Sequence, residues 1–99
     1  MKEITVVELK ALIDSKANFQ LIDVREQHEF DEANLNGQLI PMGEVMDNVD
    51  KIAKDKQVVI HCRSGKRSAT IIQVLEAQFG FDNLYNLKGG ILAYKEEIG

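Results

Sequence analysis

The sequence has little of what disulfide-rich or membrane-spanning proteins need. Among its 99 residues there is one cysteine, one proline and no tryptophan. A lone cysteine excludes an internal disulfide and fits a reducing compartment. No apolar stretch approaches the ~20 residues that cross a bilayer, and Lys2 and Glu3 place charges where a signal peptide needs an apolar core. We therefore expect a cytoplasmic protein that makes no membrane contact.

The charge balance argues against nucleic-acid binding. The formal net charge is -4 at pH 7, whereas a nucleic-acid surface is normally basic. The charge is also unevenly spread, because residues 56–75 hold no acidic side chain but contain Lys56, Arg63, Lys66 and Arg67. An acidic protein with one small basic region suits a small anion better than a polyanion.

Short apolar runs alternate with segments whose apolar residues recur at helical spacing. The expected strands are residues 3–5, 19–24, 38–40, 57–60 and 84–86. The expected helices are residues 6–13, 26–32, 42–54, 68–79 and 91–98. This alternation, without a repeat or a linker, predicts that residues 1–99 form one α/β domain with a mostly parallel sheet and helices on both faces. Ligands bind such sheets outside the carboxyl ends of the strands.

The most informative segment is residues 58–68, in which an apolar run stops at Cys62 and a short basic loop follows. The loop contains Arg63, Lys66 and Arg67, and Ser68 opens the next expected helix. A strand that ends at a cysteine, a tight cationic loop and a helix start together form an anion cradle with a sulfur at its base. The expected topology puts this cradle at the carboxyl edge of the sheet.

A thiol attacks as its thiolate, and the pKa of a free cysteine is about 8.5. Inward-pointing N–H groups of the loop, the helix N-terminus and the three cations would all lower that pKa. A shift of two units is worth ~2.7 kcal/mol and makes the thiolate the major form at neutral pH. Gly65 supplies a residue free to take positive φ. We predict a nucleophilic Cys62 at the floor of a cationic pocket; the alternative is a small buried hydrophobe at a strand end.

Other polar residues are assigned smaller roles. Asp23 and Arg25 follow the second expected strand, and we expect them to support the loop, for example as an ion pair. His61 should point to the opposite face from Cys62, so we interpret it as structural. His28 is expected to be exposed. These residues have no metal-ligand spacing, and no phosphate-binding glycine motif is present.

Three segments together resemble the rhodanese family. They are residues 21–26 followed by His28-Glu29-Phe30, residues 59–68, and Leu87-Lys88-Gly89-Gly90-Ile91. The resemblance spans about residues 4–98. It implies an α/β fold with a five-stranded parallel core sheet and sulfurtransferase activity through a persulfide on the loop cysteine. The sequence departs from the family pattern at two places. Residues 37–41 are one residue shorter than usual, which resembles the rhodanese domains of sulfur-carrier activating enzymes, and Tyr94 stands where the family often has tryptophan. Both departures concern only packing or a partner surface.

On this interpretation the Cys62 thiolate takes a sulfane sulfur from a small anionic donor such as thiosulfate and passes it to a thiol, to cyanide or to a sulfur-carrier protein. No metal or organic cofactor is required. Cys62 is the expected catalytic residue. The expected substrate-binding residues are Arg63, Ser64, Gly65, Lys66, Arg67 and Ser68.

Two other functions compete with sulfur transfer. The first is a phosphatase or arsenate reductase, which is disfavoured because the spacing from Cys62 to Arg67 is one residue too short and Ser68 stands where the arginine is needed. The shorter loop makes a smaller pocket, suited to one sulfur atom. The second is a non-catalytic binding or sulfur-relay module. Inactive members of the family typically lack the cysteine, which this sequence retains.

Overall fold

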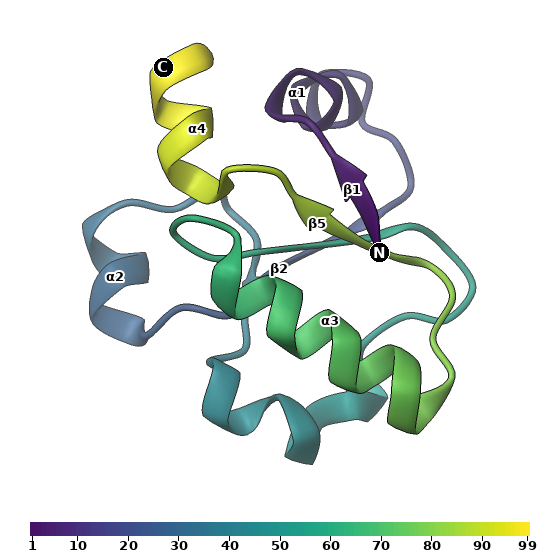
Figure 1. The fold of residues 1–99 in the computed structure, drawn as a ribbon. Helices are drawn as coiled ribbons and strands as arrows, with labels where there is room; N and C mark the ends of the chain where they lie inside the picture. The colour runs from purple at the N-terminus through teal and green to yellow at the C-terminus, as the bar shows by residue number, and fades with distance from the viewer.

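A single parallel sheet organises the computed structural model, which describes residues 1–99 (Figure 1). The strand order is β1-β5-β4-β2-β3, and every neighbouring pair is parallel. The strands are β1 (Lys2–Ile4), β2 (Gln20–Asp23), β3 (Gln38–Leu39), β4 (Val58–His61) and β5 (Leu84–Leu87). The helices are α1 (Val6–Asp14), α2 (Gln27–Glu32), the 3-10 helix η1 (Met42–Lys51), α3 (Lys66–Phe79) and α4 (Gly90–Glu97). The predicted α/β class and five-stranded parallel sheet are confirmed.

Two apolar clusters hold helices to the two faces of the sheet. In Figure 1, α1 and α4 lie on one side, while α3 and the segment at residues 42–51 lie on the other. The larger cluster has 13 buried residues and includes Ile60 of β4 and Leu75 of α3. The smaller cluster includes Leu9 of α1 and Val59 of β4. Because adjacent residues of β4 belong to different clusters, the central strand is buried from both faces, as parallel sheets require.

The carboxyl ends of β2 and β4 are level with each other. Asp23 pairs with His61 in the register of these strands, and the Val24 amide donates to the His61 carbonyl at 3.0 Å. Consequently the residues after β2 and the residues after β4 leave the sheet at the same edge. The expectation that Arg25 and Cys62 lie near one edge therefore follows from strand register.

One predicted helix was wrong in type. Residues 42–54 were expected to form a helix, but residues 42–51 form a 3-10 helix with a kink at Asn48, whose φ is -127°. The segment contains glycine, β-branched valines and several Asp and Asn residues, which are poor helix formers. The Asn48 side chain donates to the Glu44 carbonyl at 2.7 Å. This side-chain hydrogen bond competes with the backbone hydrogen bonds of a regular helix. Only Val45 of this segment is buried.

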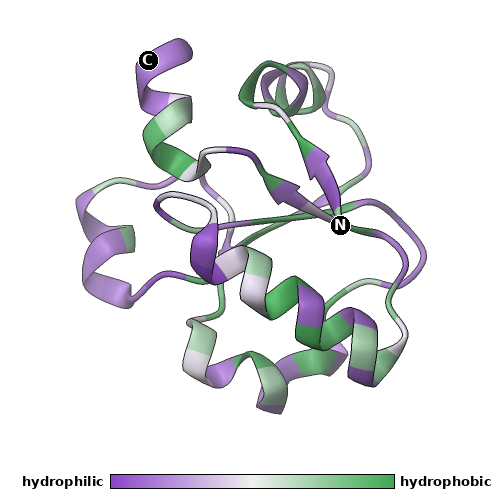
Figure 2. Cartoon of the chain, in the orientation of Figure 1, coloured by the Kyte–Doolittle hydropathy of each residue, from purple (hydrophilic) through white to green (hydrophobic).

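Two boundaries also differ for clear physical reasons. Thr5 was expected in the first strand, but it caps α1 through a capping box with Glu8. Ser68 was expected to open the fourth helix, but α3 begins at Lys66, after Gly65 takes a φ of 101°. Figure 2 shows that α2 is largely hydrophilic, and this helix buries no residue. No helix is long and apolar enough to cross a membrane.

Candidate active site

The chain turns sharply between β4 and α3, and this turn surrounds the sulfur of Cys62. Gly65 lies at a φ of 101°, a conformation that other L-residues adopt only with strain. This conformation directs the Gly65 N–H to Cys62 Sγ at a distance of 3.1 Å. Helix α3 begins at the next residue, so the positive end of its dipole also faces the loop.

These donors shift the ionisation of the thiol. Burial alone would raise the pKa of Cys62. Hydrogen bonds from the Ser68 side chain and from the N–H groups of Ser68, Gly65 and Ser64 act in the other direction, and the net result is a pKa below the usual value. The loop therefore favours the thiolate, the form that attacks an electrophile.

Asn86 of β5 holds the loop in this shape, and the sequence analysis assigned it no role. Its amide nitrogen donates to the Gly65 carbonyl at 3.1 Å, and its Oδ1 accepts from the Ser68 hydroxyl at 2.5 Å. Both Asn86 and Ser68 are buried. An asparagine in a strand that otherwise buries leucines was the available signal, because a buried amide has to be hydrogen-bonded.

Ser68 has one hydroxyl hydrogen and two acceptors near it. Cys62 Sγ lies 3.5 Å from its oxygen, whereas Asn86 Oδ1 is much closer. The Asn86 side-chain amide cannot be flipped, because a flip would place its Oδ1 against the Gly65 carbonyl oxygen, which is also an acceptor. The shorter hydrogen bond of the Ser68 hydroxyl is therefore the one to Asn86. The hydroxyl and the backbone N–H groups of Ser64, Gly65 and Ser68 together support negative charge on the sulfur.

Helix α4 closes the other side of the loop. The Ile91 amide donates to the Cys62 carbonyl at 3.0 Å, and the Leu92 amide donates to the Arg63 carbonyl at 3.1 Å. Gly90 makes this approach feasible, because a Cβ at that position would lie far inside contact distance of the same two carbonyl groups. The Gly89-Gly90 turn thus fixes the backbone on which Cys62 sits.

Asp23 and Arg25 form a buried ion pair with a nitrogen–oxygen distance of 2.8 Å. The Arg25 guanidinium also donates to the carbonyls of Glu29 and Ala33, at 3.3 and 2.7 Å. The pair thus ties the end of β2 to α2, beside the loop. The supporting role predicted for these residues in catalysis stays a prediction.

His61 is fully buried next to this ion pair. Its Nε2 lies 3.7 Å from Asp23 Oδ2 and has no hydrogen-bond partner, and its Nδ1 lies 3.4 Å from the Cys62 carbonyl oxygen. Burial lowers the pKa of His61, although the Asp23 charge opposes the shift, so the imidazole is neutral at pH 7. His28 is exposed. No group of three or more potential metal ligands is present.

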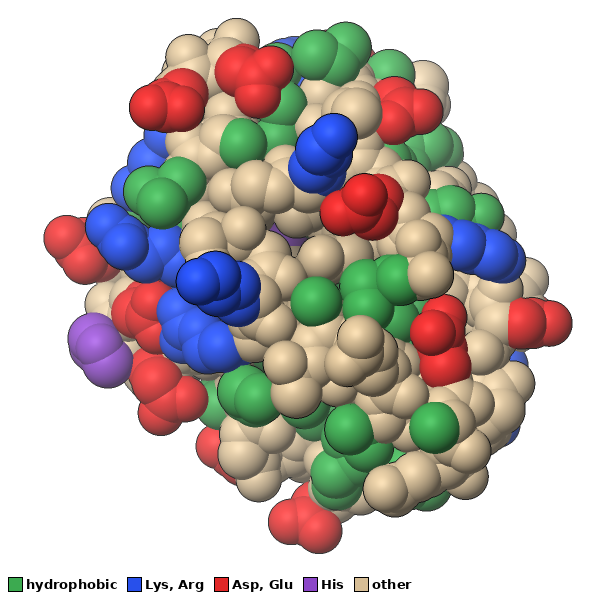
Figure 3. Space-filling model, in the orientation of Figure 1, with side chains coloured by type: hydrophobic (Ala, Val, Ile, Leu, Met, Phe, Trp, Pro, Cys, Tyr) green, Lys and Arg blue, Asp and Glu red, His purple; other side chains and the backbone are tan.

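The three predicted cations do not form an open pocket over the sulfur, although the Arg67 charge interacts with Cys62. Arg67 donates from both terminal nitrogens to the Glu29 carboxylate, at 2.8 and 2.9 Å. Arg63 and Lys66 are exposed, as is Ser64. Figure 3 shows Lys and Arg side chains gathered over the loop between β4 and α3, with acidic side chains of α2 beside them. Cys62 itself is only 1% exposed, so the sulfur lies under the loop instead of facing an open cationic pocket.

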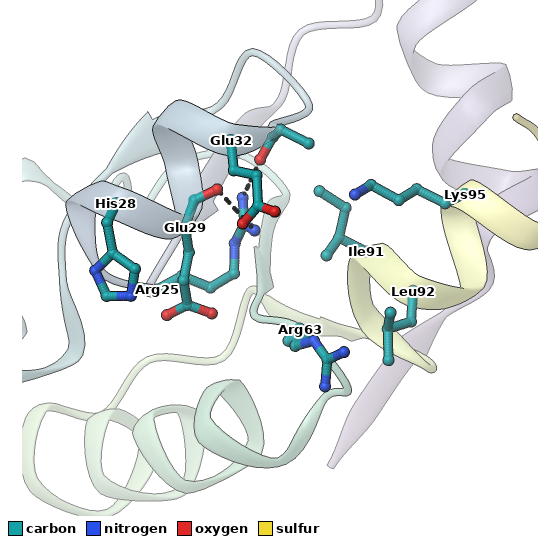
Figure 4. Close-up of a pocket in the computed structure, with 9 residues that line it drawn as sticks. Arg25, His28, Glu29, Glu32, Arg63, Ile91, Leu92 and Lys95 are labelled. Carbon is teal, nitrogen blue, oxygen red and sulfur yellow. Dashed lines mark hydrogen bonds between the residues drawn. The ribbon is translucent and has the colours of Figure 1, made fainter.

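A cavity of about 350 Å³ lies beside the loop, between α2 and the start of α4 (Figure 4). In Figure 4 the Arg25 side chain runs along the α2 side of the cavity, where its guanidinium donates to the carbonyls of Glu29 and Ala33. Arg63, the residue after Cys62, contributes to its wall. The nucleophile and a space large enough for a small molecule are thus adjacent along the chain.

The structure is thus a parallel α/β domain in which a turn with N–H donors covers a buried cysteine. Residues 5–97 match the family model described as the rhodanese-like domain, and the chain belongs to this family. The resemblance inferred from the three sequence segments is confirmed.

Relatives and solved structures agree with this membership. YtwF of Bacillus subtilis, which carries a sulfurtransferase name, is 37% identical over 98 residues, covering 98% of this chain and 93% of YtwF. MoeZ of Mycobacterium tuberculosis, named as an adenylyltransferase/sulfurtransferase, is 34% identical, but the matched region is only 25% of that protein. The crystal structure of a rhodanese-like domain protein from Staphylococcus aureus matches with a TM-score of 0.86 and 37% identity, covering 95% of this chain and 91% of that chain.

Proposed function

We propose that this protein is a sulfurtransferase that carries a sulfane sulfur as a persulfide on Cys62. The observation that carries the proposal is the Gly65 N–H, which lies 3.1 Å from Sγ at a thiol whose hydrogen bonds to the loop lower its pKa against the effect of burial. The sulfurtransferase names of full-length relatives support the same conclusion.

In the first step the Cys62 thiolate attacks the outer sulfur of a donor such as thiosulfate. A bond forms between Sγ and that sulfur, and the sulfur–sulfur bond of the donor breaks. Sulfite leaves with the electron pair, so the total charge is unchanged. The N–H groups that support the thiolate also support the negative terminal sulfur of the persulfide.

In the second step a thiolate or cyanide attacks the outer sulfur of the persulfide. A new bond forms to the acceptor, the bond to Sγ breaks, and Cys62 regains its thiolate. Neither a metal nor an organic cofactor takes part. A sulfur-carrier protein is a second kind of acceptor, suggested by the similarity to about half of YrkF of Bacillus subtilis, which is named as a sulfur carrier protein. The proposal assumes a cytoplasmic protein, because a reducing compartment keeps the thiol free.

Donor recognition falls to the exposed cations of the loop. Arg63 and Lys66 have no ion-pair partner, whereas Arg67 is held by Glu29. We therefore assign donor attraction to Arg63 and Lys66 and assign Arg67 the role of anchoring α2 to α3. Because Cys62 is 1% exposed, a donor reaches Sγ only after a small outward shift of the loop at residues 63–65.

The loop length disfavours phosphatase or arsenate reductase chemistry. Four residues separate Cys62 from Arg67, one fewer than that chemistry needs, and Ser68 stands where the arginine is needed. A non-catalytic sulfur-relay module remains the second candidate, because it would use the same persulfide. The two differ in turnover: a relay module accepts sulfur but does not release it to small acceptors.

Intact-mass measurement after incubation with thiosulfate tests the proposal. We expect wild type to gain the mass of one sulfur atom and Cys62→Ser to gain nothing. Addition of cyanide should then remove the added mass and produce thiocyanate. A persulfide that forms and never leaves would favour the relay module, and no mass gain in wild type would overturn the proposal.

The donor-binding assignment has its own test. Arg63→Ala and Lys66→Ala should each raise the KM for thiosulfate, and the effect should shrink at high salt because exposed charges are screened. A matched control is Lys51→Ala, an exposed lysine at the end of η1. Equal KM values for all of these proteins would remove Arg63 and Lys66 from the donor site.

A further inference from the structure

Charges of both signs line the cavity beside the loop. Arg25 and Glu29 are held in ion pairs with Asp23 and Arg67, whereas Arg63, Glu32 and Lys95 have no such partner. Glu32 of α2 lines one side, and Lys95 of α4 lines the other (Figure 4). Neither side chain has an ion-pair partner, although each is exposed and the two share one cavity. Two unpaired opposite charges that face the same space can each bind a different end of one dipolar molecule.

The rest of the lining is suited to a short organic ligand. Ile91 and Leu92 contribute an apolar surface, and the volume of about 350 Å³ falls in the range of small-molecule sites. This volume exceeds what thiosulfate or cyanide would fill.

The cavity is tied directly to the backbone of the nucleophile. The Ile91 amide donates to the Cys62 carbonyl at 3.0 Å, and the Leu92 amide donates to the Arg63 carbonyl at 3.1 Å. A molecule held between α2 and the start of α4 is therefore next to the loop that covers the sulfur. Arg63 lines the cavity and Cys62 does not, so an acceptor bound there meets the sulfur when residues 63–65 shift outward.

Resting on the sulfurtransferase function proposed above, we infer that this cavity binds a zwitterionic low-molecular-weight thiol, an amino-acid thiol such as cysteine, as the sulfur acceptor. Glu32 binds the ammonium group, and Lys95 binds the carboxylate. The thiol reaches toward Cys62 after losing its proton to solvent. Its sulfur attacks the outer sulfur of the persulfide, the bond to Sγ breaks, and Cys62 keeps the electron pair as thiolate.

The experiment separates loading from release. The protein is first loaded with thiosulfate, freed of donor, and then mixed with one of four thiols: cysteine, cysteamine, 3-mercaptopropionate or 2-mercaptoethanol. The measured quantity is the acceptor concentration that gives the half-maximal rate of persulfide loss. Each variant is compared with wild type for the same thiol, so differences in thiol pKa cancel.

Lys95→Gln should raise that concentration about three- to fivefold for cysteine and 3-mercaptopropionate, but not for cysteamine, as expected for loss of one exposed charge contact. Glu32→Gln should raise it for cysteine and cysteamine, but not for 3-mercaptopropionate. The matched controls are Lys51→Gln on η1 and Glu96→Gln on α4, both exposed and outside the cavity lining. They should change none of the four values.

The outcomes distinguish the two proposals. Absence of persulfide loading in wild type overturns the proposed function itself. Normal loading, with Lys95→Gln and Glu32→Gln affecting all four thiols equally or none of them, leaves sulfur transfer intact and overturns the zwitterion site.

Discussion

At the scale of single residues, Cys62 combines two properties that usually exclude each other. It is as buried as a core hydrophobe, yet its pKa is lowered. Burial alone disfavours a thiolate, so the shift depends on N–H groups that face the sulfur from the loop. The lowered pKa favours a reactive thiol over an inert buried cysteine, although that alternative correctly expects burial.

The lowered pKa predicts how the thiol reacts with pH. Alkylation by iodoacetamide should show a midpoint below the ordinary value of about 8.5 for a free cysteine, because hydrogen bonds to the loop stabilise the thiolate. Cys62 is the only cysteine, so mass spectrometry reports this one site. Glutathione measured in parallel serves as the unperturbed control. A midpoint at or above the control value would refute the thiolate.

Asn86 offers a second residue-scale prediction with an internal control. Asn86→Ala removes one of the two donors to the Gly65 carbonyl and the acceptor of the buried Ser68 hydroxyl. This loss should cost about 1–3 kcal/mol of unfolding free energy and slow persulfide formation. Asn83→Ala is the matched control for Asn86→Ala. The Asn83 side-chain amide also donates to backbone carbonyls, those of Ala53 and Lys56, but these lie far from the site. Denaturant unfolding should show similar losses for both variants, while only Asn86→Ala slows sulfur loading.

At the scale of elements, the loop is shaped by what surrounds it: β5 through Asn86, α4 through Gly90, and α2 through Arg67. Helix α2 is the weakest of these elements. It buries no residue and is held by the Arg67–Glu29 pair and by Arg25. Polar contacts alone therefore position one wall of the cavity.

Helix α4 should be sensitive to a single methyl group at Gly90. Gly90→Ala would place a Cβ against the carbonyls of Cys62 and Arg63, which should cost about 1–3 kcal/mol on top of about 1–2 kcal/mol of left-handed strain. Gly80→Ala isolates the strain, because Gly80 has a φ of 69° and no atoms around its hypothetical Cβ. Equal losses of Tm for the two variants would contradict the close contact.

The Arg67–Glu29 pair predicts an acid-sensitive anchor for α2. The Arg67 guanidinium lowers the pKa of Glu29 from 4.5 to about 2, so the pair stabilises the fold above pH ~4.5 and loses this contribution as pH falls through about 2. Glu29→Gln should cost about 1 kcal/mol at pH 6, discounted for partial exposure. Its difference from wild type, measured by urea unfolding, should shrink as the pH approaches 2, whereas Glu96→Gln should be neutral throughout.

At the scale of the whole molecule, two apolar clusters share one central strand. The radius of gyration of 12.3 Å is close to the roughly 12.6 Å expected for a compact domain of this length. Because β4 contributes to both clusters, loss of packing on either face should weaken the entire sheet. This sharing supports the prediction that residues 1–99 unfold as one domain.

Leu9→Ala on the α1 face and Leu75→Ala on the α3 face test this coupling. Both side chains are fully buried, and each truncation should cost about 2–5 kcal/mol. Circular dichroism and calorimetry should report one coincident transition in wild type and in both variants. Two separate transitions would mean that the faces unfold independently.

The sequence by itself determined the order of elements, the parallel sheet and the position of Cys62 after a central strand. These follow from local periodicity and from the apolar run that ends at residue 62, which need no knowledge of distant contacts. Local chemistry was also sufficient for the positive φ of Gly65. Local chemistry was insufficient for residues 42–54. The prediction relied on the helical spacing of the apolar residues and gave too little weight to the poor helix propensity of the others.

Only the tertiary structure decided the partners of the polar side chains. Arg67 binds Glu29, which is 38 residues away, and Asn86 binds Ser68, which is 18 residues away. Hydrogen bonds and ion pairs require distances of a few ångströms between groups that sequence spacing does not relate. The sequence therefore predicted a cationic loop around a sulfur, while folding assigned one cation to an anchor and left two exposed above a buried thiol.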